Sequence, residues 1–134
     1  GSQAGPTPLH FAARYNSNPQ VLTILVKAGA QVNARGKDGR TPLHWAAFKN
    51  SNPEVITTLV KLGAQVDARD KNGETPLHYA AADNSNPEVI LTLLELGANP
   101  KAKNDDGQTP WDLIQENDKL KNTDAYWRLN DLRY

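Results

Sequence analysis

One seven-residue motif occurs three times in this chain of 134 residues. It reads TPLHFAA at 7–13, TPLHWAA at 41–47 and TPLHYAA at 75–81, and the residues after each copy also match, so the period is 34 residues. A fixed period of this length is typical of stacked supersecondary units, none of which buries its apolar face alone. The repeat therefore predicts a row of similar units that share one continuous core.

Each unit contains the signals for two short helices and a turn. Thr41 can cap a first helix through its hydroxyl group, and Pro42 stands at the first helical position, where its missing N–H costs nothing. The segment NSNP ends this helix and starts a second one, with either Asn52 or the pair Ser51 and Glu54 as the cap. A polar segment that ends in glycine then indicates a tight turn before the next Thr-Pro.

These features resemble the ankyrin repeat, whose signature includes TPLHxA. The resemblance implies an all-α ankyrin-repeat solenoid of helix-turn-helix units with projecting β-turn loops. It implies full repeats at 7–40, 41–74 and 75–108 and a divergent C-terminal cap at 109–134, together one domain over 7–134. The family's usual repeat has 33 residues, with Gly-His between the helices. This chain has Asn-Ser-Asn-Pro and one residue more, which we expect to alter the edge opposite the turns.

Composition argues against several classes of function. Lys and Arg number 15, and Asp and Glu also number 15, so no strong net charge would attract nucleic acid or an anionic membrane. There is no cysteine, no run of about 18 apolar residues and no motif of nucleophilic, metal-dependent or phosphate-binding catalysis. We therefore expect a soluble, intracellular protein that is not an enzyme and needs no cofactor. Residues 1–6, which begin with Gly-Ser, we interpret as a disordered tag remnant.

His10, His44 and His78 recur at the repeat period, which raises the question of a metal site. Ligands of one zinc ion each place an atom about 2 Å from it, whereas packed helices lie about 8–10 Å apart. Equivalent histidines of successive repeats are therefore poorly placed to share an ion. In ankyrin-like repeats this histidine bonds to the threonine of its own motif and to adjacent backbone, so the resemblance implies a structural role.

The residue after each histidine varies, as Phe11, Trp45 and Tyr79, while its neighbours do not. In a stacked array the residues that hold units together must repeat, whereas residues that meet a partner are free to differ. We expect the three rings on the inner-helix surface, with packing between repeats and contact with a ligand as equal alternatives. Trp45 is the expected anchor, because it is central and tryptophan is enriched at interface hot spots.

By resemblance to ankyrin repeats, a protein partner binds a concave face made of turn tips and the exposed ends of the first helices. Cationic and aromatic residues precede acidic ones on this face, so we expect a partner with acidic or aromatic groups near repeats one and two. A face whose charges serve only solubility is the alternative. The residues expected to contact the partner are Arg14, Tyr15, Lys37, Asp38, Arg40, Trp45, Phe48, Lys49, Lys71, Asn72, Glu74, Tyr79, Asp83, Asp105 and Asp106.

Two alternatives to protein binding are a scaffold without a ligand and a nucleic-acid-binding protein. The high identity among repeats, the lack of methionine and the leading Gly-Ser fit an engineered or structural scaffold without an evolved ligand. Nucleic-acid binding rests only on the basic series Arg35, Arg69 and Lys103, and the acidic C-terminal half opposes it. We therefore expect neither a nucleic acid nor a membrane as partner.

The two ends of the array are expected to differ. At the C-terminus, TPWDLIQEN should form a first helix, and a last helix should begin at Thr123 and cover repeat three with Ala125, Leu129 and Leu132. The first repeat has no preceding unit, so either the protein continues upstream or this end pairs with another molecule. We expect a monomer that can self-associate there. The apolar residues left uncovered would be Leu9, Val21, Leu22, Ile24 and Leu25.

Overall fold

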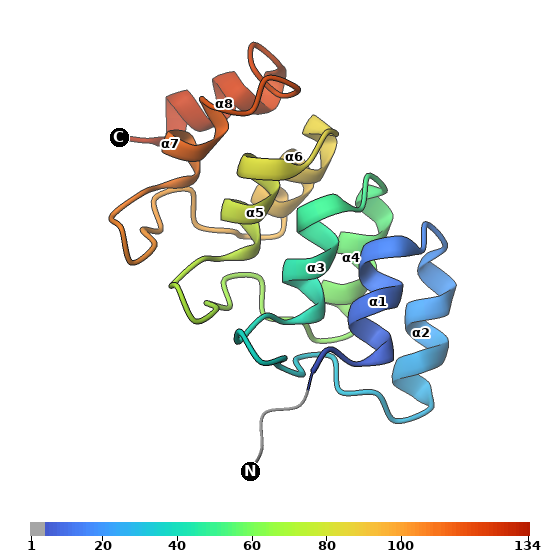
Figure 1. Ribbon diagram of the computed structural model, residues 1–134. Coiled ribbons are helices and arrows are strands. Elements are labelled where there is room, and N and C mark those ends of the chain that lie inside the picture. Colours follow the sequence, from blue (N-terminus) through green and yellow to red (C-terminus); the bar gives the residue numbers. More distant parts are fainter. Residues whose placement is uncertain (1–4) are drawn as a thin grey trace.

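The computed structural model describes residues 5–134, so the expected tag remnant falls largely outside the described residues. This part of the chain forms eight α-helices and no strand, which confirms the predicted all-α fold (Figure 1). None of these helices has the length and apolar character needed to cross a membrane. The helices are α1 (Pro8–Tyr15), α2 (Pro19–Lys27), α3 (Pro42–Lys49), α4 (Pro53–Lys61), α5 (Pro76–Asp83), α6 (Pro87–Glu95), α7 (Pro110–Ile114) and α8 (Asp124–Leu132).

Side-chain caps start the helices of each repeat. At α3 the Thr41 hydroxyl accepts a hydrogen bond from the His44 N–H, and the His44 ring accepts one from the Thr41 N–H. At α4 the Oδ1 of Asn52 accepts from the Glu54 N–H at 3.0 Å. Asn52 is therefore the cap, and the alternative box of Ser51 with Glu54 is wrong, because the asparagine stands directly before the proline of the first helical position.

The helices form two layers (Figure 1). Helices α1, α3, α5 and α7 pack side by side in the inner layer, and α2, α4, α6 and α8 do so in the outer layer. Each repeat contributes one helix to each layer. The turns between repeats all project to the same side of the molecule, on which the inner helices begin.

Apolar side chains between the layers make one continuous core that runs from α1 to α8. In the second repeat, Leu43, Ile56 and Leu59 are completely buried. Ala46 and Ala47 are equally buried, and their small side chains let neighbouring inner helices approach closely. The core is therefore shared between repeats, so the burial of one repeat depends on its neighbours.

Buried asparagines join consecutive repeats at the edge opposite the turns. The side-chain amide of Asn84 donates to the carbonyl oxygens of Ala47 (2.9 Å) and Asn50 (3.0 Å). Its Oδ1 accepts from the Asn86 N–H at 2.8 Å. Asn50 and Asn117 donate in the same way to the repeats before them. The NSNP segment therefore ends one helix, starts the next and binds the preceding repeat.

The C-terminal unit is shorter than predicted. Helix α7 has five residues, so the helix expected over TPWDLIQEN stops early, and Asn117 bonds to the preceding repeat instead. Helix α8 begins after Thr123, whose hydroxyl caps it, as expected. Ala125 and Leu129 are buried as predicted. Leu132 is 36% exposed at the rim of a groove between α6 and α8, so its expected cover of repeat three is only partial.

The first repeat is better buried than its sequence suggested. Leu9 and Leu22 are completely buried, because the second repeat and their own helix pair enclose them. Val21 and Leu25 are half-buried, and Ile24 is 64% exposed. The expectation of an uncovered apolar end is therefore confirmed for Ile24, only partly right for Val21 and Leu25, and wrong for Leu9 and Leu22.

Candidate functional site

Each of the three recurring histidines ties the start of its inner helix to the end of the turn in the same repeat. The Nδ1 of His44 accepts a hydrogen bond from the Thr41 N–H at 3.0 Å, so its Nε2 carries the proton and donates to the Glu74 carbonyl oxygen at 2.8 Å. His10 and His78 make the same pair of bonds in their own repeats. Burial lowers the pKa of all three rings, that of His44 to about 4, and so favours their neutral form. Within residues 5–134, no three His, Asp or Glu side chains converge as metal ligands would.

Two arginines just before the turns also have structural roles. The Nη1 of Arg35 donates to the carbonyl oxygens of Gly39 (2.8 Å), in its own turn, and of Arg69 (2.7 Å), in the next repeat. Arg69 makes the equivalent bonds to Gly73 and Lys103. For Arg35 and Arg69, the recurrence that suggested nucleic-acid binding is thus explained by hydrogen bonds between repeats.

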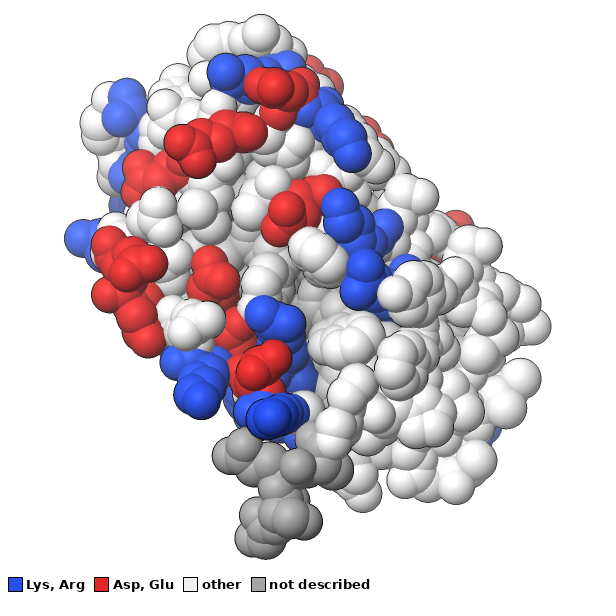
Figure 2. Space-filling model, viewed as in Figure 1, with Lys and Arg blue, Asp and Glu red and all other residues white. Residues whose placement is uncertain are grey.

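The turn tips form a row linked by backbone hydrogen bonds. The Lys71 N–H donates to the Asp38 carbonyl oxygen at 2.9 Å, and the Asp105 N–H donates to that of Asn72 at 3.0 Å. Gly39 has a φ of 76°, and a Cβ there would lie 3.0 Å from the Lys71 nitrogen, so a side chain would strain this row. Charges of both signs gather along this side (Figure 2). The exposed predicted tip residues are Lys37, Asp38, Lys71, Asn72, Asp105 and Asp106.

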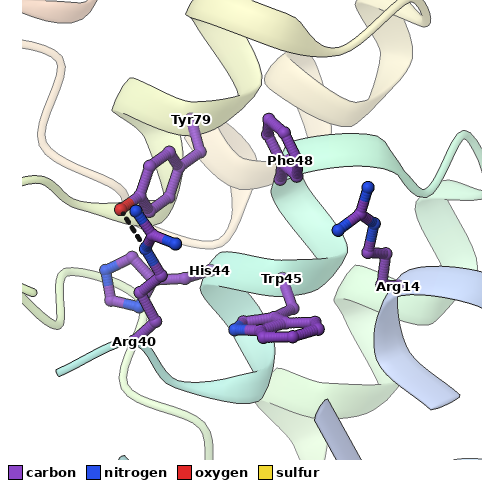
Figure 3. A pocket seen from close by; sticks show the side chains of 6 residues that line it. All are labelled: Arg14, Arg40, His44, Trp45, Phe48 and Tyr79. Carbon is purple, nitrogen blue, oxygen red and sulfur yellow. Dashed lines mark hydrogen bonds between the residues drawn. The ribbon is translucent and has the colours of Figure 1, made fainter. Parts of the chain in front are cut away.

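A pocket of about 160 Å³ opens where the first three inner helices meet the turn before α3 (Figure 3). One arginine comes from α1 and another from the turn, and aromatic rings from α3 and α5 form the walls. Five of the six lining residues belong to the predicted partner-binding set, and His44 is the addition. The lining residues are Arg14, Arg40, His44, Trp45, Phe48 and Tyr79.

Two of the three variable rings, Trp45 and Tyr79, pack edge-on against the repeat before them. The Trp45 ring lies 5.5 Å from that of His10 and 5.3 Å from that of Phe11, measured between centroids. The Tyr79 ring lies 5.3 Å from that of His44. Phe11, in the repeat without a described predecessor, is 48% exposed. Packing between repeats is therefore confirmed, and contact between these rings and a ligand stays a prediction.

Arg40 is held at the turn side of the pocket by a buried carboxylate. Its Nε donates to the Tyr79 hydroxyl oxygen at 2.9 Å, and that hydroxyl donates to Asp70. The Asp70 side chain is 1% exposed and its carboxylate lies 3.9 Å from the Arg40 Nε, while the Asp38 carboxylate lies 3.6 Å from an Arg40 Nη. Burial and the bond to Asp70 raise the pKa of the Tyr79 hydroxyl above its ordinary value. Two carboxylates thus offset the charge of Arg40.

Arg14 lies at the other side of the pocket and is held by aromatic faces (Figure 3). Its Cζ is 4.8 Å from the ring centroid of Tyr15, 5.0 Å from that of Phe48 and 6.0 Å from that of Trp45. Within residues 5–134 no carboxylate pairs with Arg14, and its buried Nε has no hydrogen-bond partner. The charge of Arg14 is therefore not offset.

The other predicted residues lie beside the pocket or away from it. The Tyr15 ring packs against Arg14 and the Lys49 ammonium group against Phe48, so both residues lie at the rim formed by the ends of α1 and α3. Glu74 is half-buried before α5, where its carboxylate accepts a hydrogen bond from Asn104 at 3.3 Å. Asp83 ends α5 outside the pocket. The six tip residues do not line the pocket either.

Asp70 and His44 are the residues that sequence reasoning missed. His44 forms a pocket wall although its two nitrogen atoms serve the framework. Asp70 occupies a position that is Gly36 in the first repeat and Asn104 in the third. A single acidic residue in an otherwise uncharged series is the signal that could have identified it.

Comparisons with known proteins agree with this geometry. A family model described as ankyrin repeats (3 copies) matches residues 1–70, which is more than half of the chain, and one described as ankyrin repeats (many copies) matches residues 59–114. A search of curated proteins found no match. The features of the family recur at the period of the motif: two helices in each repeat, a Thr-Pro cap, a histidine bonded to that threonine and a projecting turn. The chain belongs to the ankyrin repeat family.

Proposed function

We propose that this protein is a non-catalytic protein-binding module whose partner lies on the face formed by the inner helices and the turn tips. Ankyrin repeats are generally protein–protein interaction modules. Residues that hold the repeats together are the same from repeat to repeat, whereas the side chains on this face differ. In this proposal residues 7–134 act as one binding unit, because their core is continuous.

The pocket is the single observation that carries the proposal. It combines tryptophan, tyrosine and arginine, the three residue types most enriched at interface hot spots. Its volume of about 160 Å³ is smaller than the roughly 300–1,000 Å³ of most small-molecule sites. A cavity of this size suits one side chain of a larger partner, with the rest of the partner lying along the turns and the inner helices.

Binding of displayed peptides tests the proposal. Short random peptides would be selected on the whole protein, and their affinities measured by fluorescence anisotropy for the wild type and two variants. Trp45→Ala removes the pocket wall, whereas Trp127→Ala removes a half-exposed tryptophan from α8, outside the proposed surface. We expect Trp45→Ala to weaken binding at least about tenfold and Trp127→Ala to leave it unchanged.

Phe48→Ala serves as a second pocket variant, because Trp45 also packs between repeats and its removal lowers stability. Thermal unfolding of each variant identifies any loss of fold. Equal affinity of folded Trp45→Ala, folded Phe48→Ala and wild type would contradict the proposal. Failure to select any peptide would favour a scaffold without a ligand.

A further inference from the structure

We propose, on the basis of the binding function above, that the pocket recognises a carboxylate next to a large apolar side chain, so that the partner presents an acidic and apolar peptide segment. The apolar side chain enters between Trp45, Phe48 and Tyr79. The carboxylate, from an Asp or Glu side chain, pairs with the guanidinium of Arg14. The proposal rests on the different electrostatic states of the two arginines that border the pocket.

Arg40 has little capacity left for a ligand. Its Nε donates to Tyr79, and the carboxylates of Asp70 and Asp38 lie 3.9 and 3.6 Å from its guanidinium nitrogen atoms. The Asp70 side chain is almost completely buried, so water screens this attraction weakly. An incoming anion near Arg40 would also meet the charge of Asp70. Arg40 is therefore a fixed wall of the pocket.

Arg14, unlike Arg40, has no carboxylate in the described part of the chain that offsets its charge. The rings of Tyr15, Phe48 and Trp45 hold its guanidinium in place, and no carboxylate pairs with it within residues 5–134. Its buried Nε–H lacks an acceptor, which is a costly state for a charged donor. A planar guanidinium binds a carboxylate through two parallel hydrogen bonds, and little side-chain entropy is lost because the rings already restrict it. A bound carboxylate would supply the missing acceptor.

The surroundings of Arg14 favour an anion over a cation. Lys49 and Arg14 lie against the same ring, with the Lys49 Nζ 5.1 Å and the Arg14 Cζ 5.0 Å from the Phe48 centroid. A cationic ligand would find the aromatic faces already occupied by Arg14, Arg40 and Lys49, and would be repelled by Arg14 and Lys49.

The positions equivalent to Arg14 set the direction of the bound segment. They are Phe48 in the second repeat, Ala82 in the third and Glu116 in the fourth, and Asp83 follows Ala82. A carboxylate is thus attracted at the first repeat and repelled at the third and fourth. The acidic group of the partner therefore lies toward α1, and its neutral or basic part lies toward α7.

Matched peptide pools test this proposal. Every pool contains one Leu or Phe, and the adjacent position is Glu in the first pool, the isosteric neutral Gln in the second and Lys in the third. Affinities of the pools for the whole protein are measured by fluorescence anisotropy. We expect the Glu pool to bind about tenfold more tightly than the Gln pool, as for a charge-assisted hydrogen-bonded pair, and the Lys pool to bind weakest.

The ratio of Glu-pool to Gln-pool affinity is the readout for the variants. Arg14→Gln should lower this ratio to about one, and Arg14→Lys should restore part of it. Arg40→Lys, which keeps the charge that balances Asp70 and Asp38 but loses the bond from Nε to Tyr79, should keep the ratio even if it weakens both pools. Lys27→Gln, an exposed cation at the end of α2, is the matched control and should change nothing.

The outcomes separate this inference from the proposed function. If the Glu and Gln pools bind the wild type equally and Trp45→Ala abolishes both, the binding function stands and the carboxylate proposal is overturned. A ratio unchanged by Arg14→Gln overturns it as well. If no pool binds above a background peptide without an apolar residue, both proposals fail.

Discussion

The first and second repeats share their motif letters but have different surroundings. Val55 and Leu59 of α4 are completely buried, whereas their equivalents in α2, Val21 and Leu25, are half-buried. The second repeat lies between two neighbours, and the first repeat has one described neighbour. Figure 2 shows a broad surface without charged side chains over most of α1 and α2. Identical residues therefore contribute differently to stability, depending on the repeat before them.

Leucine truncation gives the largest expected difference between the two repeats. Leu59→Ala removes a completely buried side chain and should lower the free energy of unfolding by about 4 kcal/mol. Leu25→Ala, at the equivalent position, should cost about 2 kcal/mol, because part of that side chain already contacts water. Urea unfolding measures both values. Equal losses would show that the preceding repeat adds nothing to burial at this position.

The pH dependence of stability should also differ between repeats. Because burial lowers the folded-state pKa of His44 from 6.5 to about 4, the unfolded chain binds more protons between these values. The free energy of unfolding therefore falls as pH drops from about 6.5 to 4, by about 3 kcal/mol for this residue alone.

Glutamine variants isolate this effect from the titration of carboxylates. The side-chain oxygen of Gln can cap the helix as the His44 ring does, but it does not titrate. His44→Gln should flatten the fall in stability between pH 6.5 and 4 more than His10→Gln, because His10 lies in the repeat without a described predecessor. Identical pH profiles for wild type and His44→Gln would refute the assignment.

Removal of the bridging asparagine should have the next largest effect. Asn84→Ala deletes three hydrogen bonds and leaves two carbonyl groups of the preceding repeat without a donor, which should cost about 2 kcal/mol. Asn16→Ala deletes only the bond from the Asn18 N–H and should cost under about 1 kcal/mol. Thermal unfolding at neutral pH compares the two. A larger loss for Asn16→Ala would reverse the proposed order.

The smallest effect on stability is expected at Ile24. Its side chain is 64% exposed, so Ile24→Gln should change the free energy of unfolding by under about 0.5 kcal/mol. Sedimentation velocity at low and high protein concentration should show a monomer that self-associates weakly, and Ile24→Gln should reduce the association. Thr58→Gln, at the equivalent position of α4, is the control. Concentration-independent sedimentation of the wild type would exclude pairing through this end.

Most of the fold could be predicted from the sequence, because the signals for each helix are local. The Thr41 cap, the Pro42 start and the Gly39 turn depend on residues within a few positions, and their letters recur in each repeat. The ends were predicted less well. Helix α7 stops early, where Asn117 bonds to the preceding repeat, and Leu9 is buried because its own helix pair and the second repeat enclose it.

The candidate site could be predicted only as a set of side chains. Variation at Trp45 and Tyr79 indicated the face that carries the pocket, and five of the predicted residues line that pocket. The buried Asp70 was missed, because its partner Arg40 lies in the preceding repeat. Without that pairing, Arg14 and Arg40 look alike in the sequence, although only one has its charge offset.

The sequence by itself determined the period, the start of each helix and the position of each turn, since caps and turns form between residues close together in the chain. Only the tertiary structure decided which equivalent residues are buried, which arginine is paired and where the pocket lies. Those properties join residues of different repeats, such as Arg40 and Tyr79, which are 39 positions apart. Their physical cause is the stacking of one repeat on another, because it supplies the neighbours that a single repeat lacks.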